Sequence, residues 1–142
     1  MDRPIIEGVR DYLKDFTVGP VLVDFLAADD GSFSIEETPS NQVVREYVTG
    51  DSDRQFLFIF ASRMFYATED NRNNIENLHL FEKLSAWFES NNNSGVFPDL
   101  GDTRKANAVT AQTGGYLFAV DGGQELARYQ IQCRVDYRQK GC

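Results

Sequence analysis

Residues able to carry out chemistry are few in this sequence and lie far apart. His79 is the single histidine among the 142 residues, and no cysteine lies near it in the chain. Catalytic and metal-binding histidines need partners at defined positions, so we interpret His79 as a surface residue of a helix. Cys133 alternates with apolar residues and has no evident histidine partner, which is typical of a buried structural cysteine and not of a nucleophile.

The acidic and glycine-rich segments match no binding motif. Asp29-Asp30-Gly31 has the composition of a calcium loop, but with Gly31 at the turn the leading ligand positions would be Leu26 and Ala28. We interpret the segment as a polar hairpin turn. Gly114-Gly115 and Gly122-Gly123 match neither a phosphate-binding loop nor a dinucleotide fingerprint. We therefore expect no catalytic residue, no metal ligand and no cofactor.

Composition and charge narrow the class of protein. The chain is 42% hydrophobic and 13% aromatic, which is typical of a folded protein, and we assign residues 1–142 to a single domain. The formal net charge of -8 argues against direct binding of nucleic acid, because contacts with phosphate need clustered Lys and Arg.

Cysteine use and hydropathy bear on the compartment. Two cysteines are present, Cys133 within a strand pattern and Cys142 at the last position, so we expect a reducing compartment and no disulfide. Met1-Asp2-Arg3-Pro4 lacks the basic segment and apolar run of a signal peptide. No window has the length of a membrane-spanning helix, and we expect no membrane association.

The most apolar stretch, Arg54–Tyr66, predicts the strand around which the other elements are arranged. Successive side chains of a strand point to opposite faces, so Phe56 and Phe58 would face one side and Leu57 and Ile59 the other. Both faces are apolar, and a strand of this kind is usually covered on both sides. We predict a central strand with other elements packed above and below it.

Periodicity and turn residues predict the remaining elements. In chain order these are an N-terminal helix (1–18), two hairpins (20–66, pairing 21–27 with 32–37 and 43–49 with the central strand), a helix (71–91) and a C-terminal hairpin (104–139). The apolar stripe of the long helix consists of Ile75, Leu78, Phe81, Leu84 and Phe88. The expected fold class is α+β, a mostly antiparallel sheet of about five to six strands packed against a long central helix and an N-terminal helix.

The C-terminal hairpin has the clearest alternation in the chain. Its first strand spans residues 105–120, with a bend expected at Gly114-Gly115, and Asp121-Gly122-Gly123 is the expected turn. On the returning strand the residues predicted to face the core are Tyr129, Ile131, Cys133, Val135 and Tyr137, and those facing outward are Arg128, Gln130, Gln132, Arg134, Asp136 and Arg138. The outward face predicts either a partner surface or a salt-bridged solvent face.

An ordered set of segments resembles a family of phage proteins. The segments are Ser34–Pro39, Val43–Gly50, Arg54-Gln55, Phe60–Arg63, Ile75–Asn77, Phe81–Lys83 with Trp87, Gly115–Phe118 and Ala127–Arg134. Together they resemble the minor capsid or tail-terminator-like proteins of long-tailed phages and prophages of Gram-positive bacteria. The resemblance covers residues 20–139 in the same order.

The resemblance implies a structural role in a virion and no enzymatic activity. Tail terminators of this family form a ring, typically a hexamer, that caps the tail tube and joins the tail to the head. The implied partners are other copies of the chain, the major tail tube protein and the head connector proteins. The implied location is the head–tail junction of the virion, and the host cytoplasm during assembly.

Charged residues at the edges of the predicted sheet are the candidates for these contacts. They are Arg45, Glu46, Arg54, Arg128, Arg134 and Arg138. The alternative function is a small-molecule-binding or enzymatic α+β domain with a pocket between the helix at Asn71–Glu89 and the sheet. Inward positions that are almost uniformly apolar favour the structural role, because an active pocket usually holds a few placed ionisable groups.

Overall fold

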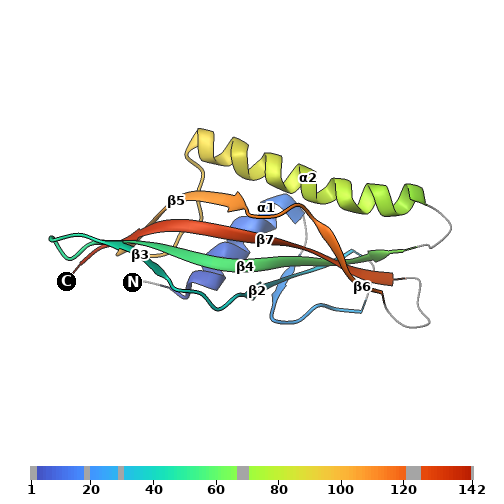
Figure 1. Ribbon diagram of the computed structural model, residues 1–142, viewed down its shortest axis with the longest axis horizontal. Helices are drawn as coiled ribbons and strands as arrows, with labels where there is room; N and C mark the ends of the chain where they lie inside the picture. The colour runs from blue at the N-terminus through green and yellow to red at the C-terminus, as the bar shows by residue number, and fades with distance from the viewer. Residues whose placement is uncertain (1–2, 18–19, 29–30, 67–70, 121–125, 142) are drawn as a thin grey trace.

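The computed structural model describes residues 3–17, 20–28, 31–66, 71–120 and 126–141, and it shows an α+β fold with two helices and a seven-stranded sheet (Figure 1). The elements are α1 (Ile5–Thr17), β1 (Val21–Val23), β2 (Ser32–Glu37), β3 (Val43–Glu46), β4 (Ser52–Phe65), α2 (Asn71–Ser94), β5 (Arg104–Ala111), β6 (Tyr116–Val120) and β7 (Leu126–Gln139). The predicted fold class is confirmed. One more strand is present than expected, because the segment 105–120 forms two strands.

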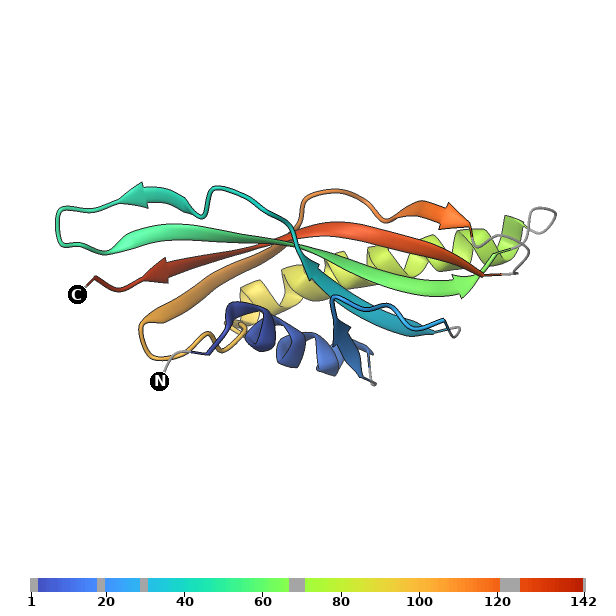
Figure 2. The same ribbon diagram turned by 90° about the horizontal axis from the view of Figure 1, so that it is seen from below.

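Two long strands, β4 and β7, form the centre of the sheet. Each has 14 residues, and they pair antiparallel from Ser52 opposite Gln139 to Phe65 opposite Leu126. Two shorter strands pair with each long strand, one along each half of its length. These are β2 and β3 along β4, and β5 and β6 along β7. A 14-residue strand spans roughly 46 Å, so the molecule is elongated, with β3 at one end and β6 at the other (Figure 2).

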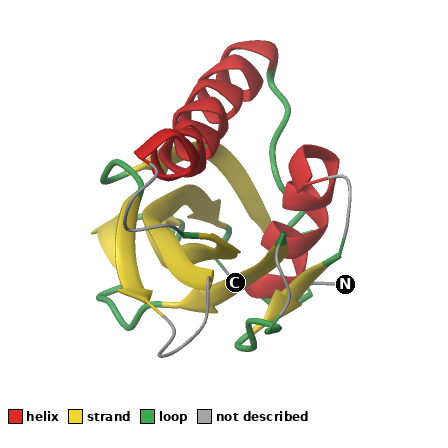
Figure 3. Ribbon diagram, turned by 90° about the vertical axis from the view of Figure 1, so that its right-hand side faces the viewer, coloured by secondary structure: helices red, strands yellow, loops and turns green. Residues whose placement is uncertain are grey.

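One face of the central pair forms the hydrophobic core. Phe58 lies directly opposite Cys133 and Phe60 opposite Ile131, and all four side chains are buried. Both helices cover this face (Figure 3). Their buried contacts come from Val9 and Leu13 of α1 and from Phe81, Leu84 and Phe88 of α2.

Neither of the two described helices lies over the other face of the sheet, so the prediction that both faces of the central strand are covered is wrong. Leu57 and Ile59 on this face are only half buried. Their partners on β7 are Arg134, which is partly buried and paired with Asp136, and Gln132, which is exposed. The aliphatic stems of such side chains can shield apolar neighbours. Long polar side chains therefore cover this face where a second layer of packed elements was expected.

Only part of the predicted apolar stripe of α2 reaches the core. Phe81, Leu84 and Phe88 are buried, whereas Ile75 is 66% and Leu78 38% exposed. The spacing of apolar residues identifies a helix face, but it contains no information on how far the sheet beneath extends. The helix continues to Ser94 and ends at Gly95, whose φ of 74° is a left-handed conformation that glycine adopts without strain.

The first predicted hairpin is wrong, because β1 pairs parallel to β2, with Val21 opposite Phe33 and Val23 opposite Ile35. The strand ends early: Asp24 has a φ of 57°, which is incompatible with extended backbone. The expected turn residues Asp29 and Asp30 lie outside the described residues.

The second predicted hairpin, β3 with β4, is confirmed, although its turn comes earlier than expected. The amide of Gly50 donates to the carbonyl of Tyr47 at 3.0 Å, so β3 ends at Glu46 and β4 begins at Ser52. The five residues between the strands, 47–51, form the turn.

The C-terminal hairpin is confirmed, with its first strand interrupted between Ala111 and Tyr116. Gly115 at the interruption touches Phe81 of α2 so closely that there is no room for a side chain. The predicted turn Asp121-Gly122-Gly123 lies outside the described residues. The five residues predicted to face the core on β7 are all buried. Gln130, predicted to face outward, is also buried, at 3% exposed.

Candidate assembly interface

A row of charged side chains crosses four strands at the β3 end of the open face. The strand registers place Arg45 of β3 opposite Asp53 of β4, Asp53 opposite Arg138 of β7, and Arg138 opposite Lys105 of β5. Cross-strand neighbours on one face lie about 5 Å apart and interact directly. The row therefore holds three cations and a single carboxylate.

Two hydrogen-bond donors hold the carboxylate of Asp53: Tyr47, beside the row, and Arg138, within it. The Tyr47 hydroxyl donates to its Oδ2 at 2.6 Å, and Arg138 Nε donates to its Oδ1 at 2.9 Å. Arg138 also donates from Nη2 to the Tyr47 hydroxyl at 3.1 Å and lies 4.6 Å from the centre of the Tyr47 ring. The hydrogen bond from Tyr47, and then that from Arg138, lowers the pKa of Asp53 below its ordinary value.

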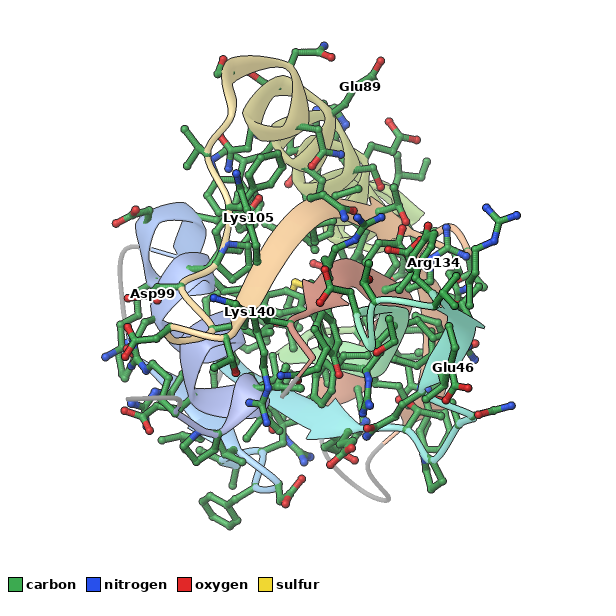
Figure 4. All side chains as sticks on the ribbon, turned by 90° about the vertical axis from the view of Figure 1, so that its left-hand side faces the viewer. Glu46, Glu89, Asp99, Lys105, Arg134 and Lys140 are labelled. Carbon is green, nitrogen blue, oxygen red and sulfur yellow. The ribbon has the colours of Figure 1, made fainter. Side chains whose placement is uncertain are left out.

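A shallow hollow next to this row gathers further basic residues. It has a volume of about 220 Å³ and is lined by Asp51, Asp102, Thr103, Arg104, Lys105, Arg138 and Lys140. Lys105 and Lys140 are exposed, and Figure 4 shows them at this end of the molecule. Arg104 is engaged within the chain, donating to Gln139 Oε1 at 3.0 Å and to the carbonyl of Arg3 at 3.0 Å. Among the described residues, no carboxylate forms an ion pair with either lysine.

A second polar cluster lies on the same face, toward the β6 end. Arg128 Nη2 donates to Glu36 Oε2 of β2 at 2.7 Å, and Arg128 Nε donates to Gln130 Oε1 at 3.0 Å. Gln130 in turn donates to the Tyr116 hydroxyl of β6 at 2.8 Å. The guanidinium also lies 5.2 Å from the centre of the Phe118 ring. This network joins β2, β7 and β6 across the face.

The structure separates the six interface candidates into different environments. Arg45 and Arg138 share the charged row, and Glu46 is exposed at the end of β3. Arg54 adjoins Asp53 in the chain, so it points to the opposite face, where its Nε donates to Ser52 Oγ at 2.9 Å. Arg134 forms an ion pair with Asp136 at 3.1 Å, and Arg128 is engaged with Glu36.

Sequence reasoning missed Tyr47, Asp53, Lys105 and Lys140. Asp53 and Arg138 are 85 residues apart, and only the strand register brings them together. The one signal in the sequence was the alternation on β7, which placed Arg138 on the open face. It could not identify the residues opposite.

The far end of the molecule exposes a group of apolar side chains. Ile75 and Leu78 of α2 are exposed there, as are Leu117, Phe118 and Val120 of β6. Exposed apolar residues that gather in one region mark contact surfaces more often than singly scattered ones. The exposed apolar residues of α2 and β6 thus lie at the opposite end of the sheet from the charged row.

The described residues contain no group of three or more His, Cys, Asp or Glu able to hold a metal ion. His79 is exposed on α2, as predicted, 3.3 Å from the carboxylate of Glu82. Cys133 is buried, as predicted, and burial raises the pKa of its thiol. A hollow of about 340 Å³ does lie between α2 and β5, but Glu89 is the single ionisable side chain lining it. This hollow therefore lacks the convergent polar groups of the alternative, ligand-binding function.

None of the helices described is long and apolar enough to cross a membrane. No protein-family model matches the chain. The curated proteins contain no match to it either.

Proposed function

We propose that this chain is a structural protein of virion assembly, a tail terminator that forms a ring on the phage tail tube and joins the tail to the head. The observation that carries the proposal is the open face of the sheet, which spans the length of β4 and β7 with neither of the described helices over it. The sequence resemblance to tail-terminator-like proteins supports the same role.

The shape and chemistry of the chain suit a ring subunit. Each subunit of a ring contacts its neighbours through two different surfaces, because the contacts are head-to-tail. The charged row with Arg45, Arg138 and Lys105 and the exposed apolar residues Ile75 and Phe118 are two such surfaces. They lie at opposite ends of strands that hold their separation fixed.

The polar networks on the open face keep that surface rigid. Asp53 has two donors in fixed positions, and Arg128 ties Glu36 of β2 to β7. Side chains that are already held in place lose little conformational entropy when a partner binds. The partners we propose are other copies of the chain, in a ring that is typically hexameric, the major tail tube protein and the head connector proteins.

Deleting the gene from the phage or prophage that carries it tests this function. Without a terminator, tail tubes should polymerise beyond their normal length and remain unattached to heads in electron micrographs. Expressing the wild-type chain from a plasmid should restore tails of normal length that are joined to heads. Tails of normal length on filled heads in the deletion strain would rule the function out.

A further inference from the structure

Two lysines at the β3 end, Lys105 and Lys140, form no ion pair with a described residue. Lys105 lies directly opposite Arg138 in register, and like charges at opposed positions destabilise a sheet. Lys140 follows the end of β7 and lines the same hollow as Lys105 and Arg138. Arg138 is paired with Asp53. Asp51 and Asp102 also line the hollow, but Lys105 and Lys140 are exposed and their ammonium groups are available to an external anion.

Helix α2 carries an exposed stripe with complementary chemistry. Ile75, Leu78, Glu82 and Glu89 are spaced by three, four and seven residues, so they lie on one side of the helix. All four are exposed, and the stripe is apolar over its first turns and acidic further along. Seven residues of helix separate the two carboxylates by roughly 10 Å, a span that two neighbouring lysines can match.

The two surfaces cannot meet within one molecule. Helix α2 covers the core face of the sheet, whereas Lys105 belongs to the open face and Lys140 follows the end of β7. Figure 4 shows Glu89 at the outer rim, beyond α2, pointing away from Lys105 and Lys140. A second copy, however, can present its α2 to the cations of the first, and each copy can use both surfaces at once. A contact of this head-to-tail kind closes into a ring when the rotation between copies permits.

We infer that the cation cluster of Lys105, Arg138 and Lys140 in one copy binds Glu82 and Glu89 on α2 of the next copy. This inference rests on the proposed function, because it requires that the chain assembles with itself. The exposed Ile75 and Leu78 of the same stripe supply apolar contact area beside the ion pairs. Charge pairing also overcomes, at short range, the repulsion between copies that are acidic overall.

Reversing each set of charges tests the contact. Sedimentation velocity of the purified full chain, alone and with purified tail tubes, gives the concentration at which half of the protein is assembled. The variants Lys105→Glu/Lys140→Glu and Glu82→Lys/Glu89→Lys should each raise this concentration by about tenfold or more. The variant with all four changes should assemble within about threefold of the wild type, because the pairs are restored with opposite polarity. Lys14→Glu, which reverses an exposed charge on α1 and breaks only a local ion pair with Asp11, is a control and should leave this concentration unchanged.

The outcomes separate the inference from the proposed function. Assembly of Lys105→Glu/Lys140→Glu at the wild-type concentration would overturn the inference. So would a variant with all four changes that assembles as poorly as the two double variants. A wild-type chain that stays monomeric, both alone and on tail tubes, would contradict the proposed function itself. Far-UV circular dichroism and the thermal midpoint establish that each variant is folded, and all four positions are exposed.

Discussion

Arg128 reaches over the central strand to Glu36, with its Nη2 2.7 Å from Oε2 of the carboxylate. The register places Arg128 opposite Arg63, and Glu36 opposite Ile59, so the pair spans the position of Ala61 between them. Ala61 and its neighbour Ser34 are completely buried although they lie on the open face.

Breaking this pair should destabilise the fold. Both side chains are less than a third exposed, and hydrogen bonds to charged groups contribute about 1.5–3 kcal/mol in such settings. We expect Arg128→Met to lower the free energy of unfolding by about 2 kcal/mol in urea titrations. A double-mutant cycle with Glu36→Gln should show a coupling energy of about 1 kcal/mol or more. Additive effects of the two substitutions would show that the pair is not coupled.

Gly115 and Gly114 provide a matched pair of substitutions. A Cβ at Gly115 would overlap the ring of Phe81, which is buried, whereas a Cβ at Gly114 would have no atom within 4 Å. We expect Gly115→Ala to destabilise the protein by about 1–3 kcal/mol, the usual cost of overpacking. Gly114→Ala should be within about 0.5 kcal/mol of the wild type in the same thermal or urea titration. Equal stability of the two variants would contradict the close packing of β6 and α2.

Asp53 should make the fold sensitive to acid. Its pKa is lowered from 3.8, chiefly by the hydrogen bond from Tyr47, so the folded state favours the ionised carboxylate. The stabilisation is therefore present above the unfolded pKa and is lost as the pH falls through the lower, folded pKa. In urea titrations at a series of pH values, Asp53→Asn should lose less stability than the wild type as the pH falls below about 4. Parallel pH profiles for the two proteins would contradict this role.

The thiol of Cys133 should be unreactive in the native protein. It is completely buried between strands of the core, and burial raises the pKa of the thiol, so the reactive thiolate is scarce. In a Cys142→Ser background, labelling by a thiol reagent should be slower than in urea by at least about a hundredfold, because it requires global unfolding. Fast labelling in native buffer would show that β7 opens locally.

The core could be predicted from the sequence because strand alternation and helical spacing reflect burial directly. A period of two predicts the five buried residues of β7 and the buried face of β4, which carries Phe56, Phe58 and Phe60. Helical spacing predicts the burial of Phe81, Leu84 and Phe88. What failed were inferences about the neighbours of these elements. The parallel pairing of β1 depends on Asp24, whose positive φ no local pattern indicates.

The candidate interface was less predictable, because it depends on register. The alternation of β7 placed Arg128 and Arg138 on one face, but it could not show that Arg128 is engaged with Glu36. Nor could it place Lys105 beside Arg138, because a bulge between Ala106 and Ala108 shifts the pairing of β5. Knowing which charges are already paired requires the cross-strand partners, and these partners are distant in sequence.

Electron microscopy of tail tubes incubated with the purified chain tests the central claim most directly. The account predicts a ring at one end of each tube, with rotational symmetry in averaged images and a mass that is a small multiple of the 16.1 kDa chain. Lys105→Glu/Lys140→Glu should leave the tube ends bare at the same protein concentration. Bare tube ends with the wild-type chain at high concentration would contradict the account.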